Sequence, residues 1–578
     1  MGKKIRGILL ITTLTFFSVG FVFQERDRIE FPQGYFISPL KIPILLAGNF
    51  GEIRNNHFHA GLDIKTMSQE GQPVLAIADG YVSRINISST GYGKALYITH
   101  PNGFTSVYGH LQRFEEPIAS YLKQQQYERE SFEVDINVDS SQLKLHQGQV
   151  VAYSGNTGAS GGPHLHFEIR ETLTEFACNP MLFGFDIEDN IRPVITALRM
   201  YPIGKNSTVN AQTGPRKITL MGYRGHYTAS TVTVRGPFAL AIEARDVINK
   251  TDNTQGIFSI EVQKDGERVF YHDLDKFGFH ESRYINSFVD YGEKKRTGRV
   301  YQKCFLDPNN RLSTFRNVIN RGIMSLEDDS THHISVIVKD AYGNTSDIDL
   351  KVRNTAGPPP PANATLEAVP QAIFPYQQSN DFDTAGLKMH MPPNIFYDTI
   401  YFNYHKAPPK PGSWSVTHEL QQSDVPVHGF YTLSIEAPDL PEALQQKAYI
   451  AAVEDGGYKS YQGGTYQDGW VTASVRSFGN FAVMVDETAP YINAINIYNG
   501  KNLKGSPWIR MQISDGASGI ASYRGTIDGK WVLMEYDKKT SLLVHYFEDS
   551  LESGEHTFEL AVRDNCGNIR EFKAKFTR

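Results

Sequence analysis

Histidine and aspartate side chains recur in two stretches of this chain at spacings that suit metal chemistry. His164 and His166 are two residues apart, and side chains two apart point to the same side of a β-strand. His59 and Asp63 are four apart, so they share a face in a strand or in a helix. Two imidazoles and one carboxylate suit zinc, and three protein ligands leave a fourth position open, as in catalytic rather than structural zinc sites.

These residues belong to three motifs: HAGLD at 59–63, YGHL at 108–111 and GNTGASGGPHLHFE at 155–168. Their order, spacing and flanking glycines resemble those of the lysostaphin/LytM zinc endopeptidases of bacterial cell walls. The resemblance covers roughly residues 36–185. It implies, position by position, that the zinc ligands are His59, Asp63 and His166, and that the catalytic histidines are His110 and His164.

The chain departs from the compact family pattern between Leu111 and Gly148, where we expect an inserted segment at about 112–147. Residues 115–130 are charged and rich in Gln, with Ile118 and Leu122 one helical turn apart, which predicts a short helix. Residues 132–138 then alternate apolar and polar, as in a half-buried strand. The insertion touches none of the proposed ligands, but it leaves the shape of the substrate groove open.

Other titratable residues near the motifs receive weaker assignments. His57 lies one alternate position before His59, and we expect it to support the site or line the groove. His100 is expected to be structural, and His146 falls in the insertion without an assigned role. Glu168 follows His166 on the same strand face, where it either orients an imidazole or is simply a buried carboxylate.

The first 24 residues have the pattern of a secretory signal. Lys3, Lys4 and Arg6 form a positive start, residues 7–23 carry no charge, and Ser18–Gly20 offers a small-x-small cleavage site. An uncleaved N-terminal anchor is the alternative interpretation. We therefore expect an exported protein of the periplasm or cell envelope, in contact with the membrane only if this segment is retained.

Composition narrows the function classes. The chain has 578 residues and a net charge of −6 with acids and bases interspersed, which argues against a nucleic-acid partner because such proteins carry a basic patch. Its three cysteines, Cys178, Cys304 and Cys566, are far apart and form no disulfide framework. One long-range disulfide is the alternative interpretation, but we expect zinc rather than disulfides to hold the catalytic centre together.

The fold class is predicted as mainly β. A lysostaphin/LytM-like antiparallel sheet domain is followed by several β-sandwiches with the short, evenly spaced strands typical of immunoglobulin-like domains. The predicted divisions are the signal or anchor (1–24), the zinc peptidase domain (36–188), a sandwich with an insertion (190–356), a Pro-rich linker (357–362), a β-rich sandwich-like domain (363–487) and a final sandwich (488–578).

The sandwiches at 190–356 and 488–578 have sequence patterns that indicate diverged copies of one domain. Each has a mid-domain aspartate, Asp246 or Asp515, and each ends in an Asp-x-x-Gly-Asn turn that begins at Asp340 or Asp564. Alternation before such a turn predicts a final β-hairpin. Aspartates near these turns could bind calcium, although turn formation by Asp, Asn and Gly is the favoured interpretation.

The motif residues and the signal-like start predict a secreted zinc metalloendopeptidase that uses a zinc-activated water. The resemblance implies that its substrate is the peptide crosslinks of peptidoglycan. The alternatives are a non-catalytic envelope scaffold or regulator of other wall hydrolases, and a zinc peptidase acting on protein substrates. The presence of all five motif residues favours an enzyme. Expected partners are peptidoglycan peptide stems and, through the sandwiches, envelope proteins. We also expect a fragment of about residues 25–190 to fold and bind zinc alone.

Overall fold

The computed structural model describes residues 31–578 except 356–368, 455, 458 and 549–550. The predicted signal or anchor and the Pro-rich linker therefore lie outside the described residues. Within the described part, no helix is both long enough and apolar enough to cross a membrane. Antiparallel strands dominate, and the longest described helix is α1 (Ile118–Arg129), so the mainly-β prediction is confirmed.

The N-terminal domain is built on a curved antiparallel sheet with the order β1-β2-β11-β6-β5-β4-β8. Its strands are β1 (Leu46–Gly48), β2 (Leu62–Lys65), β4 (Gly80–Ile87), β5 (Lys94–Thr99), β6 (Phe104–Gly109), β8 (Val134–Asn137) and β11 (His164–Glu171). Short strands β9 (Lys144–Leu145) and β12 (Ala177–Cys178) extend it. A separate three-stranded sheet joins β3 (Pro73–Leu75), β10 (Val150–Tyr153) and β7 (Arg113–Phe114).

Strand β11 shows how the sequence builds this domain. Leu165, Phe167 and Ile169 are fully buried in the main hydrophobic core, so the alternate positions with His164 and His166 point to the other face of the sheet. The predicted two-residue period of this strand is confirmed. It places the motif histidines on a polar face that is backed by a packed core.

The predicted insertion forms α1 and β8. Ile118 and Leu122 pack into the same core, and β8 pairs with β4 at the edge of the sheet. The helix thus fastens to the domain by its apolar side, which leaves its charged side for a contact described below.

The first β-sandwich follows at Val194. One sheet contains β13 (Val194–Pro202), β15 (Arg216–Ile218), β19 (Phe238–Val247), β20 (Thr254–Gln255) and β24 (Gln302–Lys303). The other contains β14 (Thr208–Val209), β16 (Leu220–Tyr223), β17 (His226–Ala229), β18 (Val232–Arg235), β21 (Ser259–Lys264), β22 (Glu267–Asp273), β25 (Thr331–Lys339) and β26 (Thr345–Asn354). Between β22 and β25 lie β23 (Lys276–Phe277), α2 (Ile285–Phe288) and α3 (Tyr291–Thr297).

This sandwich is fused to the N-terminal domain. Strand β23 pairs with β12, so the large sheet continues across the boundary. Phe50 and Phe58 of the N-terminal domain belong to the hydrophobic core of the sandwich, where both contact Phe277. The two units therefore share one interior.

Two further sandwiches complete the chain. The middle one packs β28 (Asn380–Thr384), β29 (Leu387–Met391), β33 (Tyr431–Glu436), β36 (Thr465–Gln467) and β37 (Trp470–Val475) against β31 (Tyr404–Ala407), β32 (Thr417–Leu420), β34 (Ala448–Val453), β35 (Lys459–Tyr461) and β38 (Gly479–Val485). It also carries β27 (Ala372–Phe374), β30 (Ile400–Phe402) and α4 (Glu442–Gln445).

The last sandwich packs β39 (Tyr491–Ala494), β41 (Trp508–Ser514), β44 (Glu535–Asp537) and β45 (Leu542–Tyr546) against β40 (Lys501–Asn502), β42 (Ile520–Ile527), β43 (Lys530–Trp531), β46 (Glu555–Asp564) and β47 (Ile569–Thr577). The predicted final hairpins of both copies are confirmed as β25–β26 and β46–β47. Cys178, Cys304 and Cys566 are buried and free, so the structure contains no bridge between them.

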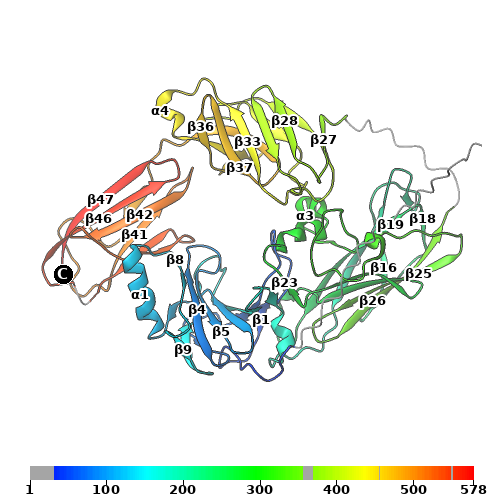
Figure 1. Cartoon of the computed structure of the whole chain (residues 1–578), viewed down its shortest axis with the longest axis horizontal. Helices are drawn as coiled ribbons and strands as arrows, with labels where there is room; N and C mark the ends of the chain where they lie inside the picture. Colours follow the sequence, from blue (N-terminus) through cyan, green and yellow to red (C-terminus); the bar gives the residue numbers. More distant parts are fainter. Residues whose placement is uncertain (1–30, 356–368, 455, 458, 549–550) are drawn as a thin grey trace, which may run out of the picture.

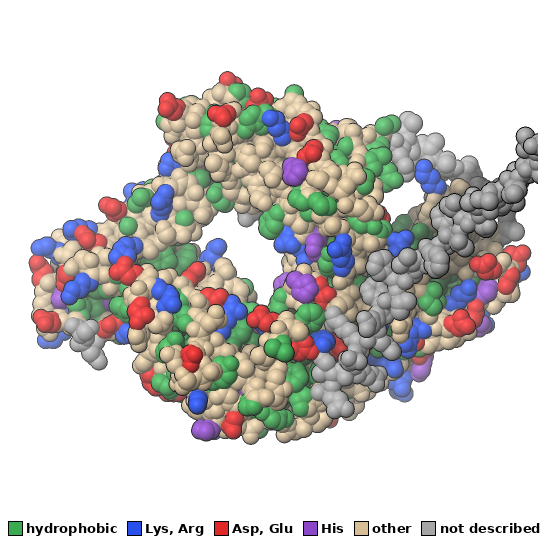
Figure 2. Space-filling model, viewed as in Figure 1, with side chains coloured by type: hydrophobic (Ala, Val, Ile, Leu, Met, Phe, Trp, Pro, Cys, Tyr) green, Lys and Arg blue, Asp and Glu red, His purple; other side chains and the backbone are tan. Residues whose placement is uncertain are grey.

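The four β-rich units form a closed ring around a central opening (Figures 1 and 2). The last sandwich returns to α1, where Lys123 pairs with Glu548 at 2.8 Å, Arg524 pairs with Glu130 at 2.6 Å, and Tyr127 packs on Trp531. The charged side of the inserted helix is thus the surface that closes the ring.

Candidate metal centre

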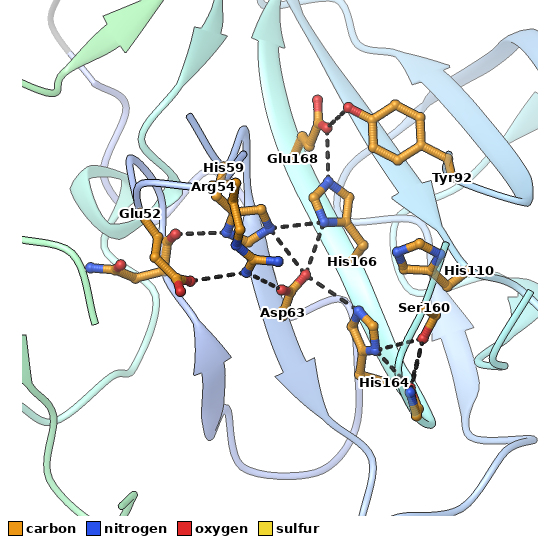
Figure 3. Close-up of polar contacts among 12 residues, drawn as sticks. Glu52, Arg54, His59, Asp63, Tyr92, His110, Ser160, His164, His166 and Glu168 are labelled. Carbon is orange, nitrogen blue, oxygen red and sulfur yellow. Dashed lines mark hydrogen bonds and ion pairs between the residues drawn. The ribbon is translucent and has the colours of Figure 1, made fainter. Parts of the chain in front are cut away.

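The five motif residues converge on one face of the β2–β11 pair (Figure 3). Asp63 on β2 lies directly opposite His166 on β11, and on the other side of β11 His166 lies opposite Gly109. Because β6 ends at Gly109, His110 follows beside this position, while His59 lies in the loop before β2. Strand register alone therefore brings the three motifs together.

Three donor atoms point at one another. His59 Nε2 lies 3.1 Å from Asp63 Oδ1 and 3.1 Å from His166 Nδ1, and the latter lies 3.0 Å from Asp63 Oδ1. Tetrahedral zinc with bonds of about 2.0–2.1 Å holds its ligand atoms about 3.3 Å apart. The donor set and its spacing therefore fit a zinc ion. His164 Nε2, at 3.3 Å from Asp63 Oδ1, lies at the edge of this group.

Each imidazole of the group is fixed by its other nitrogen. His59 Nδ1 donates to the backbone carbonyl of Asn49 at 2.7 Å, which leaves Nε2 free to bind a metal. His166 Nε2 donates to Glu168 Oε1 at 2.8 Å, which leaves Nδ1 free. Such outer partners set the tautomer and orientation of metal-binding histidines. Of the two interpretations of Glu168, the orienting role matches this contact.

Glu168 is itself held by two further side chains. Arg170 Nε donates to Glu168 Oε2 at 2.7 Å, and the Tyr92 hydroxyl donates to Glu168 Oε1. All three side chains are largely or fully buried. The pair of Glu168 and Arg170 thus keeps a charged carboxylate in the interior beside His166.

Asp63 is held from its other oxygen. Arg54 donates to Asp63 Oδ2 at 2.8 Å and is paired in turn with Glu52 at 2.9 Å. This leaves Asp63 Oδ1 facing His59, His166 and His164, so the carboxylate is oriented to offer one oxygen to a metal (Figure 3).

Electrostatics in the group follow from these contacts. Although burial opposes it, His59 and hydrogen bonds from His164 and His166 hold the pKa of Asp63 well below its usual range. Burial alone would lower the pKa of His166, but its bonds to Asp63 and Glu168 raise it to about 9. Against the effect of burial, Arg170 and His166 lower the pKa of Glu168 to about 2. Without a metal, a proton on His166 therefore occupies the place that a cation would take.

The two remaining histidines are arranged alike. His110 Nδ1 donates to the Thr157 carbonyl at 2.8 Å, and His164 Nδ1 donates to the Gly162 carbonyl at 2.8 Å. In the neutral His110 ring, Nε2 is thus the proton acceptor. His164 Nε2 instead faces the Asp63 carboxylate at 3.3 Å. Burial, with His166 and His164 nearby, lowers the pKa of His110 to about 3, so that ring is neutral near pH 7. The ring centres of His110 and His164 are 4.8 Å apart, so two further imidazoles lie beside the metal group.

The other histidines lie outside this group. His57 is exposed and contacts the Asn55 carbonyl, so it neither touches the proposed ligands nor supports them. His100 is buried and bonded to Asp79 O and Ser106, consistent with a structural role. His146 is exposed.

The sequence motifs do not indicate four further residues that contact the site: Arg54, Tyr92, Asn49 and Arg170. Arg170 had a signal, because it continues the two-residue period of His166 and Glu168 along β11. The other three come from loops or turns whose contacts depend on tertiary packing.

A buried His₂Asp group on an antiparallel sheet, flanked by two further histidines, defines a metallopeptidase type of site. Residues 57–127 match the model of Peptidase family M23, and residues 371–486 match the Zu5-like domain. The chain thus contains a peptidase M23 domain of the lysostaphin/LytM type.

Individual relatives agree with this assignment. The chain is 29% identical over 143 residues to the DD-carboxypeptidase/endopeptidase Mpg of Neisseria meningitidis, an alignment that covers 25% of this chain and 24% of that protein. It is 26% identical over 132 residues to lysostaphin of Staphylococcus simulans, covering 22% of each. The chain therefore spans about a quarter of the length of these curated relatives.

Among solved structures, the catalytic domain of the prophage-encoded M23 protein EnpA from Enterococcus faecalis is 23% identical, with a TM-score of 0.18. That similarity covers 24% of this chain and 87% of the other.

Proposed function

We propose that this protein is a zinc metalloendopeptidase that hydrolyses peptide bonds in the crosslinks of bacterial peptidoglycan. The observation that carries the proposal is the convergence of His59 Nε2, Asp63 Oδ1 and His166 Nδ1 within 3.1 Å of one another. The imidazoles of His110 and His164 lie beside this group (Figure 3). The names of the relatives support the substrate class, since Mpg is a DD-carboxypeptidase/endopeptidase.

In this proposal zinc, when bound, supplies Lewis-acid chemistry: it polarises the scissile carbonyl and lowers the pKa of water to about 7. The protein side chains handle the protons. His110 and His164 lie beside the proposed metal position, and in this proposal one accepts the proton of the attacking water while the other serves the leaving amine. Their Nδ1 atoms are tied to backbone carbonyls, which keeps both rings oriented through the reaction.

Export to the cell envelope is part of the same proposal. It is supported by the signal-like first 24 residues and by relatives named as envelope proteins, such as the lipoprotein NlpD/LppB homolog of Pseudomonas aeruginosa. We also propose that the sandwiches are immunoglobulin-like domains, which their two-sheet architecture supports.

The test is digestion of purified peptidoglycan by the zinc-loaded full chain, with mass spectrometry of the released fragments. New amino and carboxyl termini within the peptide stems or crosslinks are expected. His110→Ala should reduce turnover about 10²–10⁴-fold while zinc content is unchanged, because His110 is outside the ligand group.

Two results would contradict the proposal. Zinc-loaded protein that leaves peptidoglycan intact would favour the scaffold alternative. Cleavage of protein substrates with no action on peptidoglycan would keep the chemistry and replace the substrate.

A further inference from the structure

Three carboxylates meet where the N-terminal domain joins the first sandwich. Asp189 lies in the connecting segment, Asp246 near the end of β19, and Asp340 directly after β25. One oxygen of each lies within 4.8 Å of the others. The three residues are far apart in sequence, so the fold assembles this group.

The group contains buried polar atoms without partners. Asp246 is 0% exposed, and neither of its carboxylate oxygens has a hydrogen-bond partner. Gln255 is 3% exposed, and neither atom of its amide has a partner. Gln255 lies directly opposite Asp246 in the β19–β20 ladder, so the two side chains share one face of the sheet. Asp189 Oδ2 is also unpartnered.

Such atoms are costly in a folded protein. Leaving a buried polar group unpaired costs about 1–3 kcal/mol, and more for a charged group. Burial, together with the charges of Asp189 and Asp340, raises the pKa of the Asp246 carboxyl to about 8. Lys250, which is near in sequence, is engaged with Glu188 instead. No cationic side chain among the described residues neutralises the group.

The last sandwich offers an internal comparison. Asp486, Asp515 and Asp564 occupy the same three places, namely the connecting segment, the end of β41 and the end of β46. Asp340 and Asp564 are alike, since each accepts hydrogen bonds from its own Asp-x-x-Gly-Asn turn. In the last sandwich, however, backbone amides also satisfy Asp515, the counterpart of Asp246. Asp515 Oδ1 accepts hydrogen bonds from the backbone amides of residues 517, 518 and 519, and Asp486 Oδ2 accepts one from that of Ser518. The turn that does this has no counterpart at Asp246.

We propose that Asp189, Asp246 and Asp340, with the side-chain oxygen of Gln255, bind a divalent cation of the Ca²⁺ type. The donors are all hard oxygens, which Ca²⁺ and Mg²⁺ prefer and which differ from the nitrogen-rich group at His59. Three carboxylates and one amide oxygen leave room for the further carbonyl or water ligands that Ca²⁺ takes. This proposal is independent of the proposed peptidase activity.

The location gives the cation a structural task. The loop after Asp246 enters the N-terminal domain: Ile248 is buried in its core, and Thr251 donates to the Leu46 carbonyl at 3.0 Å. Farther along, the Asn49 side chain both donates to and accepts from the backbone of Gly256. Asn49 also provides the carbonyl that orients His59. A cation at Asp246 would therefore fix the loop that supports one proposed zinc ligand.

Equilibrium dialysis of the zinc-loaded full chain against Ca²⁺ tests the proposal. We expect one Ca²⁺ per chain with a dissociation constant of about 10⁻⁵–10⁻³ M, and a higher thermal unfolding midpoint in Ca²⁺, because a ligand that binds only the folded state stabilises it. Asp246→Asn should weaken binding at least about tenfold and abolish the thermal shift. Since burial and the neighbouring carboxylates already favour a neutral group at this position, this variant should be about as stable as the natural chain without Ca²⁺.

Asp515→Asn is the matched control, because it alters the equivalent aspartate of the satisfied cluster and should leave Ca²⁺ binding unchanged. If Asp246→Asn does not fold, Gln255→Ala is measured in its place and should also weaken binding. The proposal is overturned if the natural chain binds no Ca²⁺, if Asp246→Asn retains it, or if Asp515→Asn loses it. Zinc content measured in parallel separates this site from the His59 group.

Discussion

His166 and His164 differ in what surrounds them, although they are neighbours on one strand face. His166 is buried between Asp63 and Glu168, and its Nδ1 is directed at the other proposed ligands. His164 is more exposed, and its Nε2 reaches only Asp63 at 3.3 Å. These different surroundings suit the proposed ligand role of His166 and the proposed catalytic role of His164, two residues apart on β11.

Zinc content should follow this difference. His166→Ala is expected to lose nearly all zinc, because it removes one of three donors, whereas His164→Ala should retain most of it. Metal analysis of both purified variants is the measurement. Near-stoichiometric zinc in His166→Ala would refute the ligand assignment. Equal loss of zinc in both variants would not distinguish a ligand role from a catalytic role for the two histidines.

Zinc affinity should rise with pH. The pKa of His166 is raised to about 9 in the metal-free protein, above its unfolded value of about 6.5. Below pH 9 a metal must displace that proton, so affinity should increase about tenfold per pH unit from pH 6.5 to 9 and then level off. The proton stabilises the metal-free fold fully below pH 6.5 and is lost as the pH rises through 9.

Competition titration with a chromophoric zinc chelator at several pH values measures this dependence. Glu168→Gln is the control, because it removes one of the two carboxylates that hold the proton and should shift the levelling-off point to lower pH. An affinity that is flat between pH 6.5 and 9 would exclude a displaced proton.

At the scale of elements, the loop of residues 155–163 holds the base side of the site. Thr157 accepts the His110 hydrogen bond, and the backbone amide of Ala159 donates to the Gly91 carbonyl at 2.8 Å. Gly158 makes this fit possible. It has φ +68°, and a β-carbon there would lie 2.3 Å from the backbone nitrogen of Gly93.

Gly158→Ala should therefore reduce turnover far more than it reduces zinc binding. The left-handed conformation alone costs an L-residue about 1–2 kcal/mol, and the contact with Gly93 must also open, which moves the carbonyl that orients His110. Gly161→Ala is the matched control, because a β-carbon there meets nothing within 4 Å. Equal activity in the two variants would show that this loop does not position the base.

Local sequence patterns predicted the strands and turns better than the side-chain contacts between separate segments. The period of two in β11, the turn glycines and the Asp-x-x-Gly-Asn hairpins are local signals, and they predicted both the strands and the convergence of the motif histidines. Arg54 on Asp63 and Tyr92 on Glu168 are contacts between separate loops and strands. Because no periodicity encodes such contacts, the outer layer of the site could not be predicted.

At the scale of the whole molecule, the ring brings the last sandwich onto the site loop. Lys539 donates to the Asn156 carbonyl and to the Ser160 carbonyl, and Lys94 pairs with Glu535 at 2.8 Å. The insertion, which the sequence left as an uncertainty about the groove, instead supplies the helix on which this sandwich docks. The C-terminal sandwich thus contacts the loop of residues 155–163, which carries the Thr157 carbonyl beside the candidate site.

The fusion with the first sandwich bears on the expectation that residues 25–190 suffice for zinc binding. Phe50 and Phe58 bury their rings against Phe277, and the backbone amide of Phe58 donates to Ser282 at 2.8 Å. Fully burying one such side chain contributes about 1.5–3 kcal/mol. A fragment that ends near residue 190 exposes both rings and frees the loop that carries His59.

We therefore expect a fragment of residues 31–190 to aggregate or to bind zinc at least about tenfold more weakly than the full chain. A fragment of residues 31–354 retains β23 and the shared core, so it should match the full chain in zinc affinity. Size-exclusion chromatography and competition titration of the two fragments make the comparison. If the short fragment is monomeric and binds zinc with full affinity, the N-terminal domain is self-sufficient, and the sandwich serves placement rather than the integrity of the site.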